Sequence, residues 1–254
     1  MNKSLIRSII WLSFFLLIIL SWLYLFNMSA TMGFDWTGKI VMDMSMNSMD
    51  MSYMVSLKML FSMWSIMMLA MMLPTMVPTF LTYQDLIKSA HGTWGGWVGL
   101  LLGYIIMWTI FSLSIAYLQV FLMNTKFINN EGIIKSVWLV PALVILVGAF
   151  QFTKIKDFCH GVCITPFNYF IKKWKNGLLG GVKMGLGLGL FCIGCCWGFM
   201  ILAFVMGYMN FIWMGLVTLI VILEKLPQIG GITKKPLGIL LISIGIYLIF
   251  KNFK

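Results

Sequence analysis

The stretch IIWLSFFLLIILSWLYLF, residues 9–26, carries no charged side chain and decides the class of this protein. An apolar helix of about 20 residues, at a rise of 1.5 Å per residue, crosses a hydrocarbon core of about 30 Å. The run follows Lys3 and Arg7 and is longer than the roughly 7–15 residues of a signal-peptide core. We therefore interpret it as a retained membrane anchor.

The composition of the whole chain agrees with this interpretation. Of the 254 residues, 61% are hydrophobic and only 10% are charged, and the mean hydropathy is +0.98. Ordinary soluble domains are about 45–50% apolar and about 25% charged. This excludes a soluble enzyme and a nucleic-acid-binding domain. We attribute the net charge of +11 to cytoplasmic loops and anionic lipid.

Seven apolar runs predict an all-α, polytopic transmembrane helical bundle in the plasma membrane. A cytoplasmic N-terminus places twelve of the 18 basic residues inside and six outside, as the positive-inside rule requires. A break in the glycine-rich fifth run would change the count to six or eight. The runs are 5–27, 56–82, 97–123, 136–153, 181–207, 209–226 and 236–251.

We divide the chain into residues 1–55, an anchor with a methionine-rich extracytoplasmic loop, and residues 56–254, a metal-binding bundle. The longer loops are 28–55 outside and 154–180 inside. The chain contains no G-x-x-x-x-G-K-[ST] loop for a nucleotide, and its two histidines exclude a three-histidine centre. We expect a protein that is not an enzyme.

Residues 42–54, MDMSMNSMDMSYM, combine methionine with polar side chains, a pattern that hydrophobic packing does not require. Thioether sulfur is a soft ligand that favours Cu(I) and has no proton to lose. The alternative is a flexible loop whose methionines contact a partner or the membrane surface. The candidate ligands are Met42, Met44, Met46, Met49 and Met51, followed by Met54.

A second methionine series continues into the 56–82 run. Because its members recur every four residues, a straight helix would carry a ladder of sulfur atoms, in which Met67 and Met71 are candidate ligands. The alternative is that methionine replaces leucine in a packed or lipid-facing helix. Pro74 and Pro78 should kink this helix. The two rows are Met59, Met63, Met67 and Met71, and Met68, Met72 and Met76.

The string LFCIGCCWGFM, residues 190–200, places three cysteines at positions i, i+3 and i+4 of one helical face. Cys192, Cys195 and Cys196, with Met200 one turn further, suit a soft metal ion. The alternatives are packing of small residues and a thiol redox pair. Glycines spaced along this run let a neighbouring helix approach closely: Gly181, Gly185, Gly189, Gly194 and Gly198.

Cys159, His160 and Cys163 form a second candidate metal site, in the cytoplasmic loop. The alternative is ordinary loop composition. Glu224 is costly in lipid, so we expect it to face the bundle interior, either paired with a lysine of a neighbouring helix or in a functional role. Lys225 should extend to the membrane interface.

Five strings give the chain a resemblance to a known family: MWSIMMLAMMLPT (63–75), AFQFTKIKDFCHGVC (149–163), GLFCIGCCWGFM (189–200), FVMGYMNFIWM (204–214) and LEKLP (223–227). In these strings the chain resembles the uncharacterised polytopic family of predicted metal-binding integral membrane proteins. Lys154 stands where that family usually has proline, and His160 stands where it has a hydrophobic residue. The resemblance implies a ligand set supported by Glu224 and the second-span methionines: Cys159, Cys163, Cys192, Cys195 and Cys196.

Together these patterns favour a Cu(I)-handling membrane protein; silver would bind the same soft ligands. The outer methionines would capture the ion, the ladder would relay it, and the 192–196 cysteines would hold it. Delivery would end in the cytosol through Cys159 and Cys163, or in a membrane cuproenzyme. One alternative is a non-catalytic accessory subunit of a larger membrane oxidase or monooxygenase, surrounded by other membrane subunits. Another is a thiol oxidoreductase.

Overall fold

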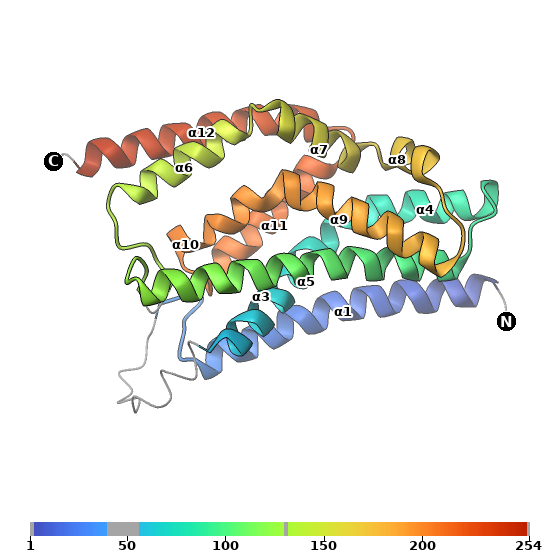
Figure 1. Ribbon diagram of the computed structural model, residues 1–254, viewed down its shortest axis with the longest axis horizontal. Coiled ribbons are helices and arrows are strands. Elements are labelled where there is room, and N and C mark those ends of the chain that lie inside the picture. Colours follow the sequence, from blue (N-terminus) through green and yellow to red (C-terminus); the bar gives the residue numbers. More distant parts are fainter. Residues whose placement is uncertain (1–2, 40–55, 130–131, 253–254) are drawn as a thin grey trace.

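The computed structural model describes residues 3–39, 56–129 and 132–252, and these ranges are almost entirely helical (Figure 1). No β-strand lies within these ranges, and an isolated bridge joins Ile128 to Ile134. The all-α class is therefore confirmed. The helices are α1 (Lys3–Thr31), α3 (Leu57–Met72), η1 (Pro74–Met76), α4 (Val77–Ser89), α5 (Trp94–Asn124), α6 (Leu139–Phe150), α7 (Lys154–Ile164), α8 (Pro166–Lys173), α9 (Gly177–Ile201), α10 (Ala203–Met206), α11 (Phe211–Lys225) and α12 (Gly230–Asn252).

Short polar side chains and prolines set several helix boundaries. Ser56, Thr93, Thr153 and Asn210 each accept a hydrogen bond from the backbone N–H three residues later, which satisfies a free donor at the start of α3, α5, α7 and α11. Pro74 cannot donate a backbone hydrogen bond, so α3 ends before it and the short 3-10 turn η1 follows. The second run is therefore interrupted at Pro74, one of the two prolines predicted to kink it, and Pro78 lies in the first turn of α4.

Each of the seven predicted runs contains a helix, but not all of these helices are long enough to cross a membrane. Five segments of the described chain are long and apolar enough, and the pair α6 and α7, bent by 61°, could form a sixth. Helix α11 has 15 residues, fewer than the roughly 20 that a span needs. The count of seven and the cytoplasmic N-terminus therefore stay predictions.

The fifth run stays helical for most of its length. Helix α9 continues to Ile201, and the short α10 follows it before Gly207, where φ is +89°. The 154–180 loop differs more from expectation, because 154–164 and 166–173 fold into α7 and α8.

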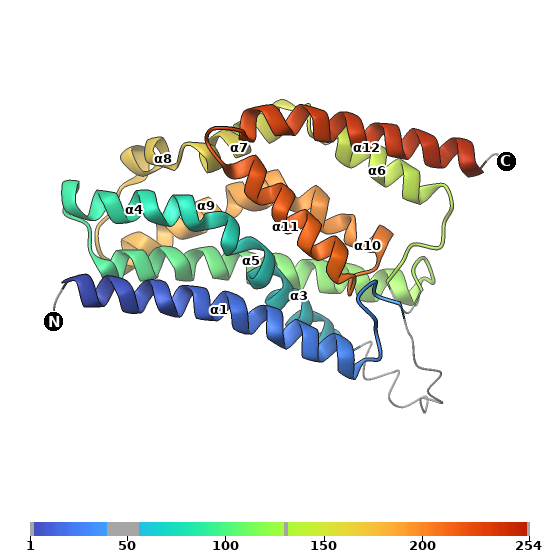
Figure 2. The same ribbon diagram turned by 180° about the vertical axis from the view of Figure 1, so that it is seen from behind.

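Helices α5 and α9 form the tightest pair of the bundle (Figure 1). A Cβ atom added to Gly185 of α9 would lie 2.2 Å from the Leu100 carbonyl oxygen, and one added to Gly103 of α5 would lie 2.2 Å from the Val182 carbonyl oxygen. The expected close approach of a helix to the glycine-rich run is confirmed. Elsewhere α12 packs along α6, α7 covers α9, and α11 packs against α3, η1 and α12 (Figure 2).

Candidate metal centre

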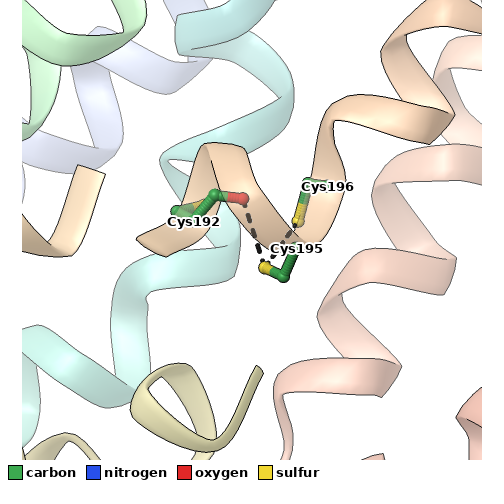
Figure 3. A group of neighbouring side chains, drawn as sticks. All are labelled: Cys192, Cys195 and Cys196. Carbon is green, nitrogen blue, oxygen red and sulfur yellow. Dashed lines mark hydrogen bonds between the residues drawn. The ribbon is translucent and has the colours of Figure 1, made fainter. Parts of the chain in front are cut away.

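Three thiols meet on one face of α9. The sulfur atoms of Cys192, Cys195 and Cys196 all lie within 4.8 Å of one another, and each side chain is buried. The Cys195 and Cys196 sulfurs are 3.2 Å apart, and the Cys195 thiol donates to the Cys192 carbonyl oxygen at 3.2 Å (Figure 3). The spacing i, i+3, i+4 predicted this grouping, because such positions share a helical face.

Helix α7 adds a fourth thiol to this group. Cys163 is buried, and its sulfur lies 3.9 Å from that of Cys195. Lys156, His160 and Cys163 face inward because positions i, i+4 and i+7 share one face of a helix. Cys159 lies to the side of this face and is only half-buried; a Cβ atom added to Gly194 would lie 2.8 Å from its sulfur.

The cytoplasmic cluster expected from Cys159, His160 and Cys163 is thus divided by the helix. Cys163 joins the α9 thiols, whereas the Nε2 atom of His160 lies 2.8 Å from the Glu224 carbonyl oxygen. That contact uses the ring nitrogen to attach α7 to the end of α11. Ligand roles for Cys159 and His160 stay predictions.

Two buried lysines surround the thiols. The Lys156 ammonium donates to Glu224 Oε2 and to the Cys195 carbonyl oxygen, both at 2.8 Å. The predicted inward position of Glu224 is therefore confirmed, and of the two roles left open the structure shows the pairing with a lysine of a neighbouring helix. Each charge of this buried pair therefore depends on the other, because an ion left alone in the interior would be strongly destabilising.

The expectation that Lys225 extends to the membrane interface is wrong. Only 3% of the residue is exposed, and its ammonium donates to Thr75 Oγ1 at 2.8 Å and to Cys192 Sγ at 2.9 Å. The Met76 sulfur lies 3.9 Å from the same ammonium. These acceptors inside the bundle replace water, so the side chain has no need to reach the interface.

The sequence did not identify Tyr104 or Thr75 as neighbours of the thiols. The Tyr104 hydroxyl lies 3.1 Å from the Cys192 sulfur and donates to the Met72 carbonyl oxygen at 3.3 Å. Both residues come from other helices, so no spacing along the chain marks them. For Thr75, the only signal was its place after Pro74, where the break in the helix turns the backbone toward α11.

The second-span methionines lie in the protein core, apart from the half-buried Met59. Met67 and Met71 are 1% and 3% exposed, so they do not face lipid, and Met200 of α9 is also buried. Their burial fits both a relay and close packing. The proposed outer ligands Met42, Met44, Met46, Met49 and Met51 lie outside the described residues.

The donor set around Cys192 has a clear chemical preference. Thiol and thioether sulfurs bind soft ions such as Cu(I), whereas hard ions such as Mg²⁺ and Ca²⁺ prefer oxygen. The buried carboxylate of Glu224, on α11, is held by Lys156. The residues present therefore fit a soft metal ion.

Comparison with known families agrees with this chemistry. The family model described as "PpoB2: Copper chaperone" matches residues 61–248, which include every helix that contributes to the thiol group. Comparison with curated proteins and with solved structures gave no significant match. The match fits a membrane copper-handling family, in agreement with the metal-binding membrane family that the chain resembles and with the copper that its soft ligands predict. Because it covers well over half of the 254 residues, this chain belongs to the PpoB2 copper chaperone family.

Proposed function

We propose that this protein is a membrane-embedded Cu(I) chaperone that holds its ion on Cys192, Cys195 and Cys196, with Cys163 as a fourth soft donor. The observation that carries the proposal is the set of three buried sulfurs within 4.8 Å of one another, in a chain that belongs to a copper chaperone family. Three thiolates at this separation suit the low coordination numbers of a soft ion.

The surroundings of the thiols support storage and transfer rather than catalysis. The four sulfurs are buried among close-packed helices, and the charged groups beside them pair with protein atoms. Exchange among several soft ligands lets an ion move without a deep trap, as conduction through multiple sites requires.

We further propose a route through the plasma membrane. The 42–54 segment, in the anchor region 1–55, captures Cu(I) outside, and the methionines of α3 pass it toward Cys192. The ion then leaves for a membrane cuproenzyme, or for the cytosol past Cys163. The buried thioethers of Met67 and Met71 support the middle step.

The first test is copper binding by the detergent-purified protein under reducing, anaerobic conditions. Elemental analysis and competition with a Cu(I) chelator would compare the wild type with the variant C192S/C195S/C196S. Loss of groups that only orient metal ligands costs about 10–100-fold in affinity, so loss of three ligands should weaken binding by more than about 100-fold.

The variant Cys159→Ser is the matched comparison, because it makes the same change in a thiol outside the three, and we expect copper to remain. Deletion of 42–54 should leave the affinity of the purified protein unchanged and slow its loading. A wild-type protein that holds no copper after incubation with Cu(I) would contradict the proposal and favour a structural accessory subunit.

A further inference from the structure

The Lys225 ammonium contacts two sulfur atoms of different kinds. The Cys192 thiol of α9 lies 2.9 Å from it, and the Met76 thioether at the end of η1 lies 3.9 Å from it. The Thr75 hydroxyl, which donates to the Met72 carbonyl oxygen, accepts from the ammonium at 2.8 Å. A cation therefore already sits where the methionine helix meets the thiols.

Met76 ends a series of thioethers that runs the length of α3. The series begins beside a surface cavity of about 420 Å³ between the ends of α1 and α3, whose lining includes Met28 and Met59. At 1.5 Å per residue, the part of the series on α3, from Met59 to Met72, is about 20 Å long, and Met76 follows in η1. Between Met59 and Met76 lie five buried methionines: Met63, Met67, Met68, Met71 and Met72.

The charge of Lys225 is not offset by a carboxylate. In the described ranges, the ion pairs join Lys156 to Glu224 and Lys234 to Asp157, and neither involves Lys225. Like charges repel strongly where water is excluded, because the effective dielectric constant is low. A metal cation that moves from the Met76 sulfur to the Cys192 sulfur must therefore approach an ammonium that contacts both.

Among the described residues, a buried acceptor without a partner lies on the residue next to Lys225. Lysine carries its charge on a flexible four-carbon stem with three rotatable donors. Glu224, the preceding residue of α11, has one carboxylate oxygen, Oε1, that is buried and has no hydrogen-bond partner in the described part of the chain. The residue next to Lys225 therefore carries a buried acceptor that the observed contacts leave unused.

We propose that Lys225 is the gate between the methionine series and the thiol group: its ammonium closes the passage from Met76 to Cys192, and it must swing aside for each soft cation that passes. This inference rests on the proposed Cu(I) function and adds how transfer is controlled. Lys225 is then a positioning residue that sets the rate of transfer, and the thiols set how much metal is held.

The test measures the rates of loading and withdrawal in the full-length, detergent-purified protein. Stopped-flow mixing with Cu(I), and then with a strong Cu(I) chelator, would compare the wild type with Lys225→Leu. We expect both rates to rise by about tenfold or more, because removing the ammonium lowers the barrier to passage, while the copper held per protein is unchanged. Lys183→Leu makes the same substitution at an exposed position of α9 and should leave both rates as they are.

Met76→Leu supplies the second arm, because it removes the thioether on the far side of the gate. Loading should slow at unchanged stoichiometry, and the double variant K225L/M76L should lose most of the acceleration, since a gate matters only on a route that is used. If Lys225→Leu does not fold, Lys225→Met keeps the length of the side chain without its charge.

The outcomes separate the two proposals. Wild-type protein that binds no Cu(I) overturns the proposed function and the gate with it. Wild-type binding, with rates in the Lys225 variants equal to those of the wild type, overturns the gate alone. Loss of bound copper in both Lys225 variants also overturns it, because Lys225 would then hold the ligands in place rather than control passage.

Discussion

Helices α1 and α9 are almost equally apolar, yet they occupy different environments. The most apolar 18-residue window of α1 has a mean hydropathy of 2.5, and 17% of it is buried within the protein. The corresponding window of the α9 span has a mean hydropathy of 2.3, and 61% of it is buried. The difference lies in residue size and type: α1 is rich in leucine, isoleucine and phenylalanine, and α9 in glycine and cysteine. Hydropathy therefore predicts that both helices suit a membrane, and small residues predict which one is enclosed by protein.

Charged side chains of other helices also contact the enclosed helix α9. Lys156 and Lys225 reach the α9 thiols from α7 and α11. On α1 the described basic side chain is Arg7, near the N-terminal end of the helix. Buried polar groups need partners, and only an interior lined by backbone and side chains can offer them.

The largest loss of stability is expected from a substitution at the contact between α5 and α9. Gly185→Val places new atoms against the Leu100 carbonyl oxygen, where even a Cβ would lie at 2.2 Å, so the helices must separate. Overpacking of a core usually costs about 1–3 kcal/mol, and we expect this change to exceed that range because backbone faces backbone. Thermal unfolding in detergent would measure the loss.

Gly215→Val is the matched control for this prediction. A Cβ added to Gly215 in α11 meets no atom within 4 Å. The variant should keep its unfolding temperature to within a few degrees. Equal stability of the two variants would show that α5 and α9 can separate freely, and that burial does not distinguish α9 from α1.

The buried ion pair beside the thiols should give the next largest effect. Lys156→Met leaves the Glu224 carboxylate buried without its cation, and breaking such a pair typically costs about 3–5 kcal/mol. The double variant K156M/E224Q should recover much of this loss, because the uncompensated charge is removed. Thermal unfolding of the two variants tests both statements; a double variant no more stable than the single one would show that packing, not charge, is lost.

Local patterns predicted the features of the site that depend on a single helix. The spacing of the cysteines in 192–196 predicted that three thiols share one helical face, and the glycine series predicted a close contact with another helix. The cost of placing a charge in lipid predicted that Glu224 faces the interior. Each follows from helical periodicity or from the membrane as a solvent.

Features that depend on how helices pack together were not predictable. Cys163 approaches Cys195 across 32 residues of sequence, and Lys225 approaches Thr75 across 150. Without its partners in view, Lys225 at a helix end fitted a position at the membrane interface. The sequence analysis assigned 154–164 to a loop, but local signals could have predicted the helix there. Thr153 is a suitable N-cap, and Lys156, His160 and Cys163 fall on one helical face.

The smallest expected effect lies on α1 itself. Leu12 is 68% exposed on the surface of the protein, so Leu12→Ala removes few contacts within it and should change the free energy of unfolding by less than about 0.5 kcal/mol. Leu25→Ala makes the same change on the same helix at a fully buried position and should cost about 2–5 kcal/mol. Unfolding of both variants in lipid nanodiscs would compare them. If Leu12→Ala proved as costly as Leu25→Ala, the outer face of α1 would have to be covered by protein, and the contrast between an outer α1 and an enclosed α9 would not hold in the membrane.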